Sequence, residues 1–169
     1  VTGGDALRKA LGSKTVVAGV GGAKCVDLEV THGDSIPFGM FSLEVRATPG
    51  HTDSCTSYVT NDQKMVFTGD ALLIGGCGRT DFQQGNPHTL YKSIHQQIFS
   101  LPDSTLIYPG HDYNGLTVST VAEEKRYNKR LNLNITEERF VKIMTELNLA
   151  HPKKIDVAVP ANLRCGSAE

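Results

Sequence analysis

The chain has 169 residues, of which 39% are hydrophobic and 21% are charged, and its formal net charge is −1 at pH 7. This length suits one domain with a sizeable buried core. The near-neutral charge lacks the electrostatic footprint that marks partners such as nucleic acid or an anionic membrane surface. No run of residues approaches the about 18 apolar positions that a membrane-spanning helix needs. We therefore expect neither nucleic acid nor a membrane among the partners of this protein.

The first half of the chain predicts short strands joined by tight turns. A helical pattern at residues 5–11 ends at Gly12. Asn61 and Asp62 have the composition of a hairpin turn between the last two predicted strands. Runs of β-branched residues and alternating apolar and polar residues predict strands at 15–18, 26–30, 41–47, 56–60 and 64–67.

The second half changes to a helical period. Leu90, Ile94 and Ile98 are four residues apart and share one predicted helix face. Further helices are predicted at 119–128, which begins with a cap and acidic residues, and around 140–147, opened by a cap near Asn134 or Thr136. A short buried strand is predicted at 105–108, and a last strand or extended segment at 155–159. Because strands come first and helices are mixed in later, we expect one α/β domain over residues 1–169.

Three candidate metal ligands each follow an apolar run and a glycine. His51 follows Pro49 and Gly50, Asp70 follows Gly69, and His111 follows Gly110. One such residue alone is more often a turn or surface residue, but three repeats of the pattern indicate a metal centre. Two histidines and one carboxylate suit ferrous iron, whereas additional His and Asp ligands would suit one or two zinc ions and hydrolysis. The residue types alone leave both metals open.

A glycine-rich segment at 75–82 follows Asp70 closely. Glycines let the backbone approach a ligand, Arg79 can hold a carboxylate with two hydrogen bonds, and Tyr113 can add a hydroxyl. From the spacing alone, an Arg79–Asp81 pair that only shapes the loop is an equally good interpretation. Cys77 lies near the candidate site, but without a flanking base it is not expected to be a nucleophile.

The remaining titratable residues give structural expectations. The irregular cysteine spacing, without any C-x-x-C pair, argues against a zinc ribbon and favours reduced thiols. The cysteines are Cys25, Cys55, Cys77 and Cys165. The histidines outside the candidate site are expected on the surface, and they are His32, His88, His95 and His151.

Taken together, these segments resemble the persulfide dioxygenases, also called sulfur dioxygenases, of the metallo-β-lactamase-fold superfamily. The segments around His51, Asp70 and His111 resemble the whole superfamily, whereas Gly-Arg-Thr-Asp-Phe, His-Asp-Tyr and Pro-Ala-Asn are more specific to the dioxygenase branch. The matching segments are 47–52, 67–74, 76–83, 107–113 and 158–162.

The resemblance implies an αββα sandwich with one ferrous ion per chain. It assigns His51 and Asp70 as iron ligands, together with a histidine of an upstream His-x-His-x-Asp-His motif. His111 is implied to be a catalytic residue at the site that does not bind the iron. Arg79 and Tyr113 are implied to line the glutathione pocket.

The resemblance also implies an activity and a location. Relatives oxidise glutathione persulfide with dioxygen, giving sulfite and glutathione in hydrogen sulfide catabolism. Such proteins often form homodimers, and they lie in the mitochondrial matrix of eukaryotes or in the cytoplasm of bacteria.

One part of the family pattern is absent from the 169 residues, namely the His-x-His-x-Asp-His motif. We therefore expect this chain to correspond to the C-terminal two thirds of the fold. Two alternatives stay open. One is a dinuclear zinc hydrolase of acyl-glutathione thioesters, of the glyoxalase II kind, and the other is a fragment without turnover.

Overall fold

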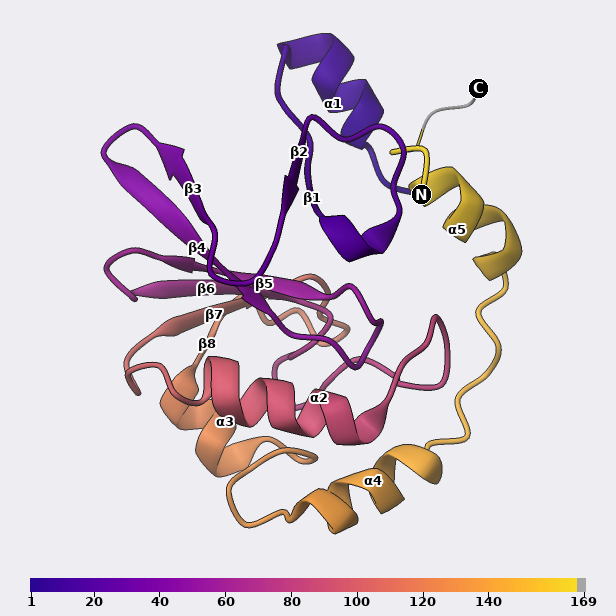
Figure 1. Cartoon of the computed structure of the whole chain (residues 1–169). Coiled ribbons are helices and arrows are strands. Elements are labelled where there is room, and N and C mark those ends of the chain that lie inside the picture. Colours follow the sequence, from indigo (N-terminus) through magenta and orange to yellow (C-terminus); the bar gives the residue numbers. More distant parts are fainter. Residues whose placement is uncertain (167–169) are drawn as a thin grey trace. The chain divides into compact units, whose positions relative to one another are not determined.

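The computed structural model describes residues 1–166 and divides the chain into two compact units (Figure 1). Unit 2 consists of residues 31–147, and unit 1 consists of residues 1–30 and the segment from residue 148 onward. The single domain predicted over residues 1–169 stays a prediction. Within the described residues, no helix combines the length and the apolar character needed to cross a membrane.

A mixed sheet forms the frame of unit 2, with the strand order β3-β4-β5-β6-β7-β8. Neighbouring strands are antiparallel except for β6 and β7, which are parallel. Consequently β4, β6 and β7 run in one direction and end at the same edge of the sheet. The strands are β3 (Ser35–Phe38), β4 (Phe41–Ala47), β5 (Thr56–Thr60), β6 (Met65–Gly69), β7 (Leu106–Pro109) and β8 (Ser119–Thr120).

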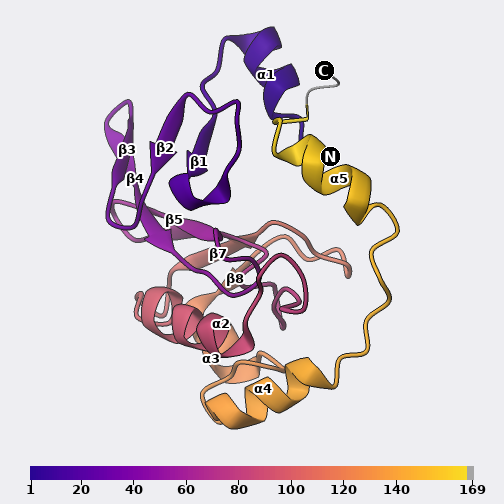
Figure 2. The ribbon, with the colours of Figure 1, turned by 45° about the vertical axis from the view of Figure 1, so that its right-hand side comes forward.

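Helices cover one side of this sheet, as Figures 1 and 2 both show. They are α2 (Pro87–Ser93), its π-helical continuation η2 (Ile94–Ile98), α3 (Val121–Tyr127) and α4 (Glu137–Thr145). The predicted cap at the start of α4 is confirmed, since the Thr136 side chain accepts the N–H of Arg139. At α3 the prediction began too early, because Ser119 pairs with β7 and a capping box at Thr120 starts the helix one residue later.

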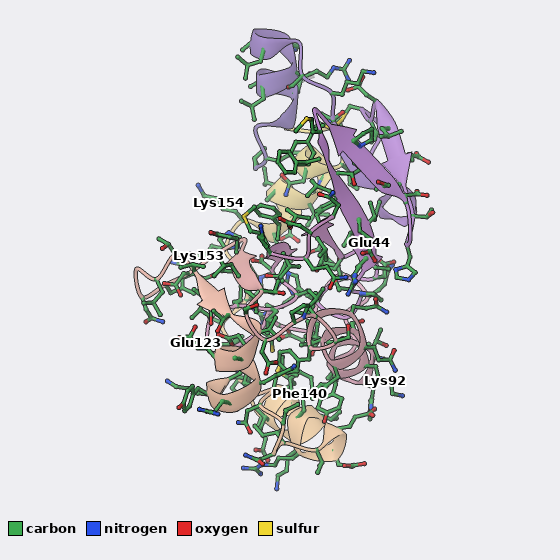
Figure 3. All side chains as sticks on the ribbon, turned by 90° about the vertical axis from the view of Figure 1, so that its left-hand side faces the viewer. Glu44, Lys92, Glu123, Phe140, Lys153 and Lys154 are labelled. Carbon is green, nitrogen blue, oxygen red and sulfur yellow. A yellow bond between two sulfur atoms is a disulfide. The ribbon has the colours of Figure 1, made fainter. Side chains whose placement is uncertain are left out.

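The core of unit 2 lies between the sheet and these helices. Val59, Val66 and Ile107 from the strands and Phe140 from α4, labelled in Figure 3, are fully buried. Each such side chain contributes about 1.5–3 kcal/mol of transfer free energy. The predicted helix face is confirmed, since Leu90, Ile94 and Ile98 all lie in the same core cluster.

His95 is an exception to the predicted surface histidines. Its ring stacks on Tyr91 with centroids 4.1 Å apart and meets Phe99 edge-on at 5.1 Å. Its buried Nε2 atom has no hydrogen-bond partner among the described residues. The expectation of an exposed side chain was wrong because Tyr91, His95 and Phe99 are four residues apart on one helix face, which places the imidazole between two aromatic rings.

Unit 1 joins the two ends of the chain. Its elements are α1 (Gly4–Leu11), β1 (Val16–Ala18), the 3-10 helix η1 (Gly19–Gly21), β2 (Leu28–Val30) and α5 (Ile155–Asn162). Strands β1 and β2 pair in parallel, and Gly12 ends α1 as predicted, in a left-handed conformation with φ of 63°. The N–H of Thr2 donates to Asn162 Oδ1 at 2.8 Å, which holds the N-terminus beside α5 (Figure 2).

Two sequence predictions for unit 1 were wrong. Residues 155–159 form the start of helix α5 rather than a strand, because Ile155 and Val159 also suit one helix face and Asp156 favours a first helical turn. Cys25 and Cys165 form a disulfide across a separation of 140 residues rather than two reduced thiols. Cys55 and Cys77 are free, as expected.

We expect the stability of the protein to fall under mildly acidic conditions because of His95. Burial lowers the pKa of this imidazole below its usual value of 6.5, so the unfolded chain binds a proton that the folded chain excludes. The contribution of the neutral ring is therefore complete above the unfolded pKa and is lost as the pH decreases below it. Urea unfolding of the protein and of His95→Phe at about pH 7.5 and about pH 5.5 measures this effect. Equal pH dependence of both proteins would contradict it.

Candidate metal centre

The shared edge of β4, β6 and β7 gathers the predicted site residues. Because β6 and β7 are parallel, with Gly69 opposite Pro109, the loops that carry Asp70 and His111 leave the sheet side by side. His51 follows β4 after a tight turn at Gly50, where φ is 131° and a Cβ atom would overlap the backbone of Leu90. Only glycine allows this turn to pack against α2, which places His51 beside the other two loops.

The imidazole of His51 has a defined orientation. Its Nδ1 lies 2.6 Å from the carbonyl oxygen of Arg79, and because a carbonyl only accepts, Nδ1 donates. In the neutral ring, Nε2 therefore presents its lone pair. That atom lies 3.9 Å from Asp70 Oδ2, which is too long for a hydrogen bond but suits two donors that bind one ion.

Asp70 connects His51 to His111. Its Oδ1 accepts a hydrogen bond of 2.6 Å from His111 Nδ1, so the carboxylate has one oxygen toward each histidine. The His111 ring lies parallel to the ring of Tyr113, with centroids 6.3 Å apart and an interplanar angle of 4°. Tyr113 is 84% exposed. The structure thus places four of the five predicted site residues next to one another, namely His51, Asp70, His111 and Tyr113.

The fifth predicted residue, Arg79, contacts His51 through its backbone carbonyl, while its side chain pairs with Asp81. Nε and Nη2 donate to the two carboxylate oxygens of Asp81 at 2.6 and 2.7 Å. These bonds hold the pKa of Asp81 below its usual value. The guanidinium also lies 4.4 Å from the ring centre of Phe82. The pair fixes the guanidinium, so a substrate carboxylate would have to share it with Asp81.

Gly78 makes the closest backbone approach to the site. Its N–H donates to the carbonyl oxygen of Asp70 at 2.9 Å. A Cβ atom at this position would overlap that same oxygen and would lie 2.7 Å from His51 Nδ1. The glycine-rich segment therefore packs its backbone directly against both candidate ligands, as expected of glycines near a site.

Cys77 is a buried structural thiol. Its side chain is 3% exposed and its Sγ lies 3.7 Å from Met144 Sδ. Burial raises the pKa of this thiol to about 11, so its thiolate is scarce at neutral pH. The structure agrees with the prediction that Cys77 is not a nucleophile.

The donor atoms of the described residues decide how well this site would fit a metal ion. Among residues 1–166, no group of three or more His, Cys, Asp or Glu side chains is arranged as a site for a metal ion. His51 Nε2 and Asp70 Oδ2 nevertheless converge, and both are donor types that iron and zinc accept. His51 also has the hydrogen bond to a carbonyl that metal-binding histidines typically make. The described residues therefore fit part of a metal site.

A buried polar cluster behind the glycine-rich segment was missed by the sequence analysis. Glu124 and Asn128 are 2% and 0% exposed, and with Arg130 they hydrogen-bond the backbone of residues 75–77. The sequence signal that points to this cluster is the spacing of its residues along the helix. Val121, Glu124 and Asn128 are spaced i, i+3 and i+7, which places two polar residues on the apolar face of a helix.

Comparison with known proteins agrees with this architecture. The sequence profile described as Metallo-beta-lactamase superfamily matches residues 14–111. The chain belongs to the metallo-beta-lactamase superfamily. The fold class predicted from the sequence is thereby confirmed. The solved structure of ETHE1 from Myxococcus xanthus matches 99% of this chain and 72% of that chain, with a TM-score of 0.94 and 50% identity. A metallo-beta-lactamase from Staphylococcus aureus matches 96% of this chain and 54% of that chain, with a TM-score of 0.85 and 27% identity.

Curated relatives extend the similarity to nearly the whole chain. The proteins named persulfide dioxygenase ETHE1, mitochondrial, of Mus musculus and Homo sapiens are each 58% identical to it over 167 residues. The match covers 98% of this chain and 65% of each relative, so the chain spans somewhat less than two thirds of their length. The resemblance to persulfide dioxygenases seen in the sequence is confirmed.

We expect Gly78→Ala to destabilise the protein and Gly76→Ala to leave it nearly unchanged. The added methyl at position 78 would overlap the Asp70 carbonyl oxygen, whereas nothing lies within 4 Å of the methyl at position 76. Such crowding typically costs about 1–3 kcal/mol, against about 0.5 kcal/mol or less for the control. Urea unfolding of both variants measures the difference. Equal stability of the two variants would show that the close approach at Gly78 is not needed.

We expect iodoacetamide to label Cys55 before Cys77 in the folded, unreduced protein. Cys55 is partly exposed, whereas Cys77 is buried and its pKa is raised to about 11. Peptide mass spectrometry after brief labelling measures the two sites separately. Faster labelling of Cys77 would mean that its environment is open, contrary to the structure. Labelling after full unfolding is the control that both thiols can react.

Proposed function

We propose that the protein is an iron-dependent dioxygenase that oxidises glutathione persulfide to sulfite and glutathione. The observation that carries this proposal is the 58% identity to proteins named persulfide dioxygenase over 98% of the chain. A match of this extent runs across every segment that forms the candidate metal centre. The activity would make the protein an oxidoreductase of hydrogen sulfide catabolism.

In this proposal, His51 Nε2 and Asp70 hold one ferrous ion per chain. Ferrous iron supplies, when bound, the dioxygen chemistry that amino-acid side chains lack. The chain itself supplies orientation, since the Arg79 carbonyl holds His51 in the tautomer that leaves Nε2 able to bind a cation. The third family ligand would come from a His-x-His-x-Asp-His motif, which the 169 residues do not contain.

His111 is the proposed catalytic residue beside these ligands. Its Nδ1 donates to Asp70 Oδ1, which holds that carboxylate in place. Its Nε2 then faces away from Asp70 and can accept or deliver a proton near the substrate. With 60% of its side chain exposed, His111 is open to an incoming small molecule.

Arg79 and Tyr113 are the proposed glutathione-binding residues. Glutathione carries two carboxylates, and a guanidinium held rigidly by Asp81 loses little conformational freedom when it binds one of them. Tyr113 adds an exposed ring and hydroxyl next to His111. Dioxygen is the second substrate, and a homodimer is the proposed assembly.

The proposed location follows the relatives. The mouse, bovine and human proteins are named as mitochondrial, which supports the mitochondrial matrix if the source is a eukaryote. For a bacterial source we propose the cytoplasm.

A thioester hydrolase is the second candidate function. The hydroxyacylglutathione hydrolase of Brucella anthropi is 46% identical over 88 residues, which cover 52% of this chain and 33% of that relative. Such a protein would act on glutathione derivatives too, but with zinc in place of iron. The shorter match makes it the weaker candidate, and metal content separates the two.

We expect about one iron per chain when the relatives' His-x-His-x-Asp-His segment is fused upstream of residue 1, and less iron in the 169-residue chain alone. Both proteins are loaded anaerobically with ferrous iron and measured by elemental analysis, followed by oxygen uptake with glutathione persulfide. His51→Ala should lower iron content and oxygen uptake together. His88→Gln is the matched control, because His88 pairs with Glu137 rather than with a site residue.

Two results would overturn the proposal. The first is two zinc ions per fused chain together with hydrolysis of an acyl-glutathione thioester. The second is oxygen uptake that is unaffected by His51→Ala.

A further inference from the structure

The carboxylate of Glu124 is a buried charge that the proposed chemistry does not use. Its residue is 2% exposed within helix α3. The described donors to it are neutral: the N–H of Gly75 at 3.0 and 3.2 Å, Ser119 Oγ at 2.7 Å and Asn128 Nδ2 at 2.6 Å. Burial of a carboxylate is costly unless hydrogen bonds satisfy it. A helix that only needed to cover the core would be more stable with an apolar residue here.

The same cluster binds the backbone of the glycine-rich segment at three consecutive residues. Asn128 Nδ2 donates to the carbonyl of Gly76 at 3.0 Å, and Arg130 Nη1 donates to that of Cys77 at 3.0 Å. The amide of Asn128 has a fixed orientation, because its Oδ1 accepts two backbone N–H groups from residues 130 and 131. Together with the Gly75 N–H, these contacts tie residues 75–77 to α3 and to the segment that follows it.

The next two residues are the ones that contact the candidate ligands. Gly78 donates to the Asp70 carbonyl oxygen and lies against the His51 ring, and the Arg79 carbonyl accepts from His51 Nδ1. Residues 75–79 therefore form a short backbone connection between Glu124 and the imidazole of His51. No side chain on the exposed surface takes part in this connection.

We propose that Glu124 is a positioning residue for His51, acting through the backbone of residues 75–79. The Glu124 carboxylate anchors Gly75, the anchored segment places the Arg79 carbonyl, and that carbonyl sets the tautomer and direction of the imidazole. The proposal rests on the proposed metal-binding role of His51. It assigns to helix α3 a part in the site that neither the sequence pattern nor the proposed chemistry requires.

The test compares Glu124→Gln with Glu123→Gln in the 169-residue chain. Glu123, labelled on α3 in Figure 3, is exposed, and it serves the capping box, in which glutamine works as well. Glu123 touches the Glu124 cluster only through a long contact of 3.3 Å with Ser119 Oγ, whose 2.7 Å hydrogen bond goes to Glu124. The same change on the same helix therefore alters the carboxylate that binds Gly75 and Asn128 in one variant and keeps it in the other. Glutamine at 124 keeps the size of the side chain but replaces one of the two acceptor oxygens by an N–H donor. It can therefore no longer accept on both sides, from Ser119 and from Asn128, as the carboxylate does.

The first readout is the tautomer of His51 in the metal-free protein, measured by long-range ¹H–¹⁵N NMR. We expect a single species with the hydrogen on Nδ1 in the wild type and in Glu123→Gln, and a mixture of tautomers in Glu124→Gln. A general loss of stability does not produce this change in a protein that remains folded. The proposal is overturned if Glu124→Gln is less stable in urea but keeps the wild-type His51 signals.

The second readout is the affinity of His51 for Zn²⁺, a diamagnetic probe, followed at the same ring nitrogens. We expect Zn²⁺ to bind about 10-fold more weakly in Glu124→Gln than in Glu123→Gln. If Zn²⁺ leaves the His51 signals unchanged even in the wild type, the metal role of His51 fails, while the tautomer comparison still decides the role of Glu124.

A second variant covers the case in which Glu124→Gln does not fold. Arg130→Ala removes the hydrogen bond to the Cys77 carbonyl, together with the interaction of the guanidinium with the Cys77 thiol, and leaves the donors to the Glu124 carboxylate in place. We expect the same tautomer mixture in a smaller proportion. An unchanged His51 spectrum in a folded Arg130→Ala protein would contradict the proposed connection.

Discussion

The candidate site depends on one constraint, the approach of the Gly78 backbone to Asp70 and His51. The N–H of Gly78 lies 2.9 Å from the Asp70 carbonyl oxygen, and its Cα faces the His51 ring without room for a methyl group. This approach lets the carbonyl of the next residue, Arg79, reach His51 Nδ1. The direction of the Nε2 lone pair is therefore decided by main-chain atoms, which have far less freedom than a side-chain partner would have.

The sheet and the helices contribute in different ways to this arrangement. The common direction of β4, β6 and β7 brings three loops to one edge, which sets which residues meet. The helices decide how those residues are oriented, because α2 packs against Gly50 and α3 binds the segment at residues 75–77. A fold that kept the sheet but shifted either helix would retain the same residues at the edge without their present geometry.

Much of this could be predicted because it follows from local signals. The glycines before Asp70 and His111, the apolar run before each of them and the Thr136 cap are all visible within a few residues of sequence. The structure has them at these positions, and it contains the Arg79–Asp81 pair that the spacing left as one of two interpretations. The direction in which strands pair is not local. The repeated pattern therefore predicted a metal centre without its structural reason, which is the parallel pairing of β6 and β7.

The features that were missed have different causes. The half-buried ring of His95 lies between Tyr91 and Phe99, four residues away on either side. Helix α5 formed where a strand or extended segment was predicted, because a short apolar run suits both structures. The spacing of Glu124 places it on the apolar face of its helix, but only its donors from residues 75, 119 and 128 show that its carboxylate belongs to a hydrogen-bonded cluster. Of these, the Glu124 cluster depends on a distant segment, since Gly75 lies 49 residues away in the sequence.

The disulfide between Cys25 and Cys165 gives the chain an additional property. It closes a covalent ring that contains all of unit 2, since residues 31–147 lie between the two cysteines. A single proteolytic cut inside the ring would leave the two pieces joined until a reductant is added. In the chain-entropy view, a ring of this size removes on the order of 5 kcal/mol of conformational freedom from the unfolded chain at 25 °C. The covalent link would thus favour folding of the whole segment.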